Sequence, residues 1–272
     1  MTMTVQPLYV RCSREQALTT WIGAGLNALL VVWSAVWLFD ARATSPSWPV
    51  LAAVVFAGMF LADLFTGVIH WMTDTWFDEI AMTRVISIAR EHHLYPHHIL
   101  GYGFRDYVGY TSWPAVVAFG PFLVWLLIGA PSSATAFGTV LLLSEICLLC
   151  FFGTHFHRFG HRRARNPVVR ALQRAHLLIT PEYHARHHGG GHDTHYCVVN
   201  GWANVVCDAI GFWRGLEVVA RRLTRAVPRY NDAEWFARFR QDRSFVTDPV
   251  PSLRQWRGED LAAHERPSKG VV

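Results

Sequence analysis

Long apolar runs alternate with shorter polar segments along this chain of 272 residues. Four of the runs are long enough to cross a hydrocarbon core of about 30 Å as a helix. They cover residues 21–39, 48–71, 113–130 and 134–153. We therefore expect an all-α integral membrane protein with about four transmembrane helices. The first run is long for the apolar part of a cleaved signal peptide, so we interpret it as a signal anchor.

The polar segments between and after these runs divide the chain into three expected parts. Residues 1–20 form a short N-terminal segment, residues 21–225 one membrane domain, and residues 226–272 a polar tail. Within the domain, residues 77–112 predict one or two interfacial helices. Residues 211–225 alternate apolar side chains with arginine, which is typical of a basic amphipathic helix lying on the bilayer, although an ordinary packed helix stays open.

The distribution of charge predicts which way the membrane domain faces. The net charge is +5, and arginine accounts for nearly all of the basic residues. These arginines gather before the first run, within 77–112 and after the fourth run. By the positive-inside rule both termini and the 77–112 segment are cytoplasmic, and we expect a bacterial inner membrane. No nucleic-acid motif is visible, so we expect the basic surface to face the membrane.

Histidine is concentrated in one part of the chain. Fourteen of the fifteen histidines lie between His70 and His195. This residue is costly next to lipid and is a preferred ligand of transition metals. The positive-inside topology places every group on the cytoplasmic side, and we expect a histidine-rich helical cap there.

The histidine spacing favours metal binding. Residues separated by three or four positions share one face of a helix, and the pairs 157/161 and 70/74 and the H-x-x-H-H run at 184–188 have that spacing. The candidate ligands are His70, Asp74, His92, His93, His157, His161, His184, His187 and His188. A single ion takes about four ligands, so this number favours two. Imidazole with a little carboxylate suits iron, and open coordination positions permit oxygen chemistry.

Several other polar residues carry weaker expectations. Asp63 and Thr66 continue the face of His70 into the second run, and Glu145 lies in the middle of the fourth run. An ionisable group there is a functional candidate, with pairing to a hydroxyl as the alternative. Cys147 and Cys150 are expected to be small buried apolar residues. A structural role, as hydrogen-bonded residues and not as ligands, is expected for His97, His98, His155, His195 and His264.

Six stretches together resemble one known family, the membrane lipid desaturases that include plasmanylethanolamine desaturase and the plastid phosphatidylglycerol desaturase. In chain order they are ADLFTGVIHWMTDTW (62–76), REHHLYP (90–96), THFHRFGH (154–161), AHLLITPEYHARHH (175–188), HDTHYCVVNGWAN (192–204) and GFWRGLE (211–217). The resemblance implies an iron-dependent, O2-dependent site that inserts a double bond into a lipid chain. It assigns the same nine positions to the site and adds His176 and His192 as further ligands or supporting residues.

The resemblance also sets the expected cofactors and partners. It implies two Fe ions, O2 as co-substrate and a phospholipid substrate in the membrane, with the vinyl-ether double bond of plasmalogens as the expected product. No flavin, haem or iron–sulfur motif is visible, so electrons must come from an external donor, a ferredoxin or a small cytochrome with its reductase. The open alternatives are an acyl-chain desaturase, a lipid hydroxylase on the same site, and a membrane metal transporter or sensor.

Overall fold

The computed structural model describes residues 14–76, 92–93, 96–101, 108–162, 164–189 and 192–228, without the side chains of 14–17, 97, 98 and 101. The elements in chain order are α1 (Arg14–Asp40), η1 (Arg42–Thr44), α2 (Trp48–Thr75), η2 (Pro96–Gly101), α5 (Ser112–Gly129), α6 (Ala134–Phe151), α7 (Gly153–Phe159), α8 (Pro167–Arg174), α9 (Pro181–His188), α10 (Trp202–Ala209) and α11 (Phe212–Thr224). The expectations for residues 77–91, the side chains of His97 and His98, His264 and the tail beyond 228 lie outside these residues.

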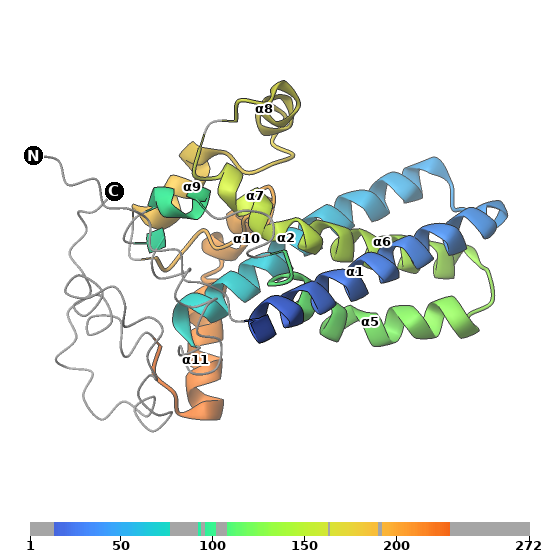
Figure 1. The fold of residues 1–272 in the computed structure, drawn as a ribbon, viewed down its shortest axis with the longest axis horizontal. Coiled ribbons are helices and arrows are strands. Elements are labelled where there is room, and N and C mark those ends of the chain that lie inside the picture. Colours follow the sequence, from blue (N-terminus) through green and yellow to red (C-terminus); the bar gives the residue numbers. More distant parts are fainter. Residues whose placement is uncertain are drawn as a thin grey trace, which may run out of the picture.

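Four long helices form the membrane part of the protein. The apolar segments Leu18–Asp40, Trp48–Thr75, Ser112–Gly129 and Ala134–Phe151 have the length and hydropathy of membrane spans. Helix α6 packs against α1, α2 and α5, so it is the central member of the bundle (Figure 1). The expectation of an all-α membrane protein with four spans is confirmed, and the described residues contain no strand.

The bundle interior is apolar and closely packed. One cluster joins Leu30 of α1, Leu123 of α5 and Val140 of α6. Cys147 and Cys150 are fully buried in a second cluster, which confirms that they serve as small apolar residues. Many aliphatic side chains on the outer surface are exposed, as expected for helices surrounded by lipid.

Helix α2 is longer than the hydrocarbon core of a membrane is thick. Its 28 residues extend over about 42 Å at 1.5 Å per residue, which is about 12 Å more than the hydrocarbon core. Thr66 and Thr111 both lie against Gly153, so the last turns of α2 stand beyond the level where α5 begins and α6 ends. His70 and Asp74 are in these last turns.

The short helices α7 to α11 gather at this same end of the bundle (Figure 1). Helices α8 and α9 begin at Pro167 and Pro181, where a missing N–H costs nothing. Asn166 and Thr180 cap them by accepting hydrogen bonds from backbone N–H groups. Pro167 and Pro181 thus mark the starts of two short helices of the histidine-rich cap.

Candidate metal centre

Histidines from four separate parts of the chain converge where the cap meets α2. They come from the end of α2, from residues 92–93, from α7 and the residues just after it, and from α9. Two groups each place one ligand atom per residue within 4.8 Å of all the others. We call them site A (His92, His157, His161, His184 and His188) and site B (His70, Asp74, His93 and His187).

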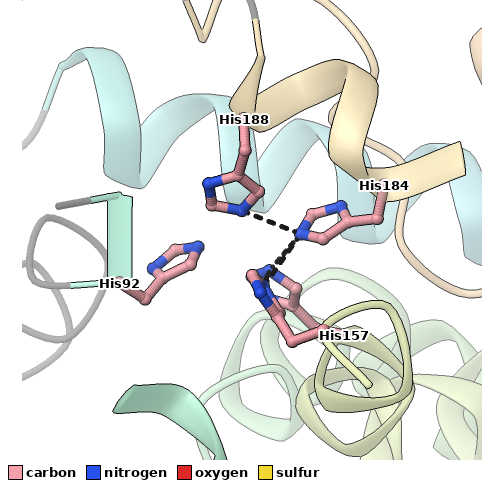
Figure 2. A group of neighbouring side chains, drawn as sticks. His92, His157, His184 and His188 are labelled. Carbon is pink, nitrogen blue, oxygen red and sulfur yellow. Dashed lines mark hydrogen bonds between the residues drawn. The ribbon is translucent and has the colours of Figure 1, made fainter. Parts of the chain in front are cut away.

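Site A is built only of imidazoles, and their Nε2 atoms point at one another. Figure 2 shows four of the rings around a common centre. The Nε2 atoms of His157, His161 and His184 form a triangle with sides of 2.9, 3.2 and 3.0 Å, and the His188 Nε2 lies 3.1 Å from that of His184. A ring nitrogen carries either one hydrogen or one lone pair, so three mutual neighbours cannot all be satisfied by hydrogen bonds. A cation at the centre satisfies all of them.

Site B has a carboxylate as its central group. The Asp74 Oδ2 lies 3.3 Å from the Nε2 of His70, 3.5 Å from that of His93 and 3.4 Å from that of His187. Asp74 is buried, and neither of its oxygens has a hydrogen-bond donor within the described part of the chain. Burying a carboxylate without donors is costly unless a cation accompanies it. Three imidazoles and one carboxylate are ligands suited to iron.

Backbone carbonyls orient two of the site B histidines. The Nδ1–H of His70 donates to the Tyr196 carbonyl at 2.9 Å, and that of His187 donates to the Thr194 carbonyl at 2.7 Å. Because a carbonyl only accepts, Nδ1 must carry the hydrogen and Nε2 must present its lone pair. Such outer partners are typical of histidines that bind metals.

Four buried histidines of the cap have lowered pKa values, which favours their neutral form. Burial, reinforced by the neighbouring imidazoles, lowers the pKa of His93, His157, His184 and His188 well below the ordinary 6.5. Neutral imidazole is the form that binds metal. The unusual arrangement of facing nitrogens and the charge state therefore both fit a pair of metal ions.

Asp63 holds the loop that supplies the two carbonyls. Its carboxylate accepts four backbone N–H groups at 2.9 to 3.1 Å, from Val199, Asn200, Gly201 and Ala203. Asn204 adds two hydrogen bonds to the backbone of Cys197. Asp63 was expected on the polar face of the second span, and the structure makes it an anchor for the loop. The sequence did not predict the roles of the Thr194 and Tyr196 carbonyls, because every residue has a backbone carbonyl and the residue type does not show which one binds a histidine.

The other histidines occupy different surroundings. His192 stacks on His93 with centroids 4.1 Å apart, and it forms a third group with His93 and His188. His176 is exposed and lies outside all three groups. The Nδ1 of His195 lies 3.0 Å from the Asp208 carboxylate, and His155 packs its ring near Phe159.

Glu145, the acidic residue in the middle of α6, also lies outside the three groups. Its carboxylate abuts Gly58 of α2, where a Cβ would overlap it. Gly58 therefore leaves the space that the Glu145 side chain occupies. A functional role for the Glu145 carboxylate and its pairing with a hydroxyl both stay predictions.

Comparison with known proteins gives a consistent result. A family model described as a lipid desaturase domain matches residues 59–231. The chain is 30% identical over 196 residues to mouse plasmanylethanolamine desaturase 1, covering 69% of this chain and 71% of the relative. It is 28% identical over 195 residues to plasmanylethanolamine desaturase of Myxococcus xanthus, covering 68% and 66%. It is 31% identical over 207 residues to chloroplastic fatty acid desaturase 4 of Arabidopsis thaliana, covering 73% and 60%. No solved structure matches.

Proposed function

The chain belongs to the lipid desaturase family, and from that premise we propose that it is a membrane oxidoreductase that uses two iron ions and O2 to insert a double bond into a lipid chain. The observation that carries the di-iron proposal is the division of nine side chains into two adjoining groups. The rings of His70 and His157, one from each site, have centroids only 4.9 Å apart. Ions in sites A and B would therefore be close neighbours.

In this proposal site A holds one iron through imidazoles and site B holds the other through three imidazoles and Asp74. His192, stacked on His93, supports the junction between them. Iron with O2 supplies the oxidation that a saturated chain requires. The reaction converts –CH2–CH2–, O2, two electrons and two protons into –CH=CH– and two molecules of water. The protein orients two of the ligands, His70 and His187, through the carbonyls of Tyr196 and Thr194, and it buries the ligand side chains away from water.

We propose the 1-alkyl chain of an ether phospholipid as the substrate, with a plasmalogen-type vinyl ether as the product. Two of the relatives are named plasmanylethanolamine desaturases. The position of sites A and B supports this choice, because the last turns of α2 stand near the level of lipid head groups. A bond next to the glycerol ether lies near that level, whereas the middle of an acyl chain lies deeper.

The electrons come from outside this chain in the proposal, from a ferredoxin or a small cytochrome with its reductase. The arginine distribution supports a cytoplasmic site in a bacterial inner membrane, since Arg158, Arg162 and Arg165 follow the fourth span directly. A donor in the cytoplasm would then reach the cap without crossing the bilayer.

Lipid mass spectrometry of a plasmalogen-free bacterial host supplied with alkyl ether lipids tests the reaction. Wild-type protein should produce acid-labile vinyl ethers, and Asp74→Ala should produce none, while His155→Ala, outside both sites, should retain the product. A new acyl double bond would favour an acyl-chain desaturase, and a hydroxylated lipid would favour a hydroxylase. Purified wild-type protein with two irons per chain but no lipid product in any form would contradict the enzyme proposal.

A further inference from the structure

The contacts between helices show how deep each part of α2 lies. Gly153 lies against Thr66 and Thr111, at the level where α6 has ended and α5 is about to begin. This level marks the end of the apolar spans nearest the cap. Asp63 is about one turn inside it, and Phe56 is ten residues, or about 15 Å, inside it. Phe56 therefore lies at hydrocarbon depth.

The segment from Val199 to Ile210 runs beside this deep part of α2. The Asp63 carboxylate binds the backbone of residues 199–203. The Trp202 ring stacks on Phe56 with centroids 5.1 Å apart, and α10 packs against α2 (Figure 1). A segment of the cap thus reaches back from the metal centre to a depth that the four spans occupy.

The two faces of α10 have the polarity of a helix surrounded by lipid. Its polar side chains point inward, where Asn204 bonds to Cys197 and Asp208 bonds to His195 and Trp213. The outward face is aliphatic, and the side chains of Val205, Val206 and Ile210 are 66%, 48% and 69% exposed. A surface helix in water shows the opposite pattern.

The backbone N–H groups before α10 also have hydrogen-bond partners within the protein, as an environment without water requires. Residues 196–201 are not helical, so their N–H groups lack the partners that a helix provides. Irregular backbone at membrane depth is tolerated only where protein groups satisfy it. Asp63, from inside α2, satisfies three of these groups, those of Val199, Asn200 and Gly201, and also the N–H of Ala203 in the first turn of α10. Asn204 satisfies both backbone groups of Cys197.

We propose that residues 199–210 form a re-entrant segment whose outer face, made of Val205, Val206 and Ile210, contacts the hydrocarbon tails of the bilayer. The chain enters beside the metal centre, touches α2 at depth, and turns at Gly211 (φ 66°) into the arginine-bearing helix α11. This proposal does not depend on the reaction catalysed. It adds a membrane-embedded element to the four spans.

Spin labelling in phospholipid vesicles tests the depth directly. Val205→Cys in a Cys12→Ser background carries a nitroxide, and the cysteines at 147, 150, 197 and 207 are buried. Collisions with O2, which concentrates in hydrocarbon, are compared with collisions with a water-soluble nickel chelate. The label should resemble one at Val117→Cys, on the exposed outer face of α5, and differ from one at Arg222→Cys, on the exposed face of α11.

Two results would overturn the proposal. One is nickel accessibility at position 205 equal to that at position 222, which would place α10 in water. The other is a label reached by neither reagent, which would mean that protein covers the face. Ile210→Cys, also strongly exposed, provides a second variant if Val205→Cys does not fold. O2 accessibility at either position with low nickel accessibility supports lipid contact.

Discussion

Replacing Asp63 should uncouple site B from its support while leaving site A in place. The Asp63→Ala variant removes both acceptors of the four backbone N–H groups between Val199 and Ala203. A buried donor left without a partner costs about 1–3 kcal/mol. Four of them cost about 4–12 kcal/mol, which is comparable with the about 5–15 kcal/mol that stabilises a typical protein. The loop should therefore leave α2 instead of staying docked with four unmet donors.

Undocking of the loop should weaken metal binding, because the loop supplies the two carbonyls that orient His70 and His187. Tyr196 and Thr194 would no longer hold the Nδ1–H groups of His70 and His187, both of which belong to site B. Removing such outer partners typically weakens metal binding about 10–100-fold. We expect iron analysis of purified Asp63→Ala protein to give about half of the wild-type content, with a lowered melting temperature.

Two further variants test whether the lost hydrogen bonds of Asp63 cause the loss of iron. Asp63→Asn keeps the oxygen that accepts three N–H groups and turns an amide N–H toward Ala203, so it should cost about 1–3 kcal/mol and retain more iron. Thr66→Val, one turn away, removes a hydroxyl that donates to the Asp63 carbonyl within α2. This variant should retain the full iron content. If Asp63→Ala protein held two irons with wild-type affinity and melted at the wild-type temperature, the reasoning from the loop to site B would be wrong.

Three further outcomes follow from the same geometry. His184→Ala and His70→Ala should each leave one iron per chain, in sites B and A respectively, and abolish lipid product; a full iron content in either variant would contradict the two-site division. Gly201→Ala should lower stability by about 1–3 kcal/mol, because φ is 82° and the added Cβ would lie 2.7 Å from the Tyr183 ring. Gly25→Ala, with nothing within 4 Å, should leave the melting temperature unchanged or raised. In metal-free protein, the lowered pKa values of the buried cap histidines mean that the unfolded chain binds more protons below the ordinary pKa of 6.5. Stability should thus be fully present above pH 6.5 and fall as the pH drops below it, and a flat melting temperature between pH 7.5 and 5 would contradict neutral burial.

The membrane architecture could be predicted from local sequence. Whether about twenty successive residues favour hydrocarbon over water depends on those residues alone, so four apolar runs predicted four spans. Helix α2 ends at Thr75, a turn beyond its expected end at residue 71. The last turn of α2 could not be predicted from hydropathy, because its polar residues contact the cap and not lipid.

The division of the ligands could not be predicted from spacing. The spacing of the H-x-x-H-H run was expected to place its three histidines together on one face of a helix, and the structure assigns His184 and His188 to site A and His187 to site B. On a helix, His187 projects about 60° to one side of His184 and His188 about 40° to the other, so His187 and His188 point about 100° apart. His92 and His93, which are adjacent in the chain, are divided in the same way.

By itself the sequence determined the four spans, the kinds of ligand available and their placement near one end of the bundle, because hydropathy and residue type are properties of short segments. Only the tertiary structure decided which imidazoles face one another and which carbonyls orient them. It also decided that Asp63 anchors a loop instead of joining the metal centre. Most of these features depend on contacts between different elements, with separations such as 27 positions for His157 with His184 and 136 positions for Asp63 with Val199. Such contacts cannot be read from the pattern of any one segment.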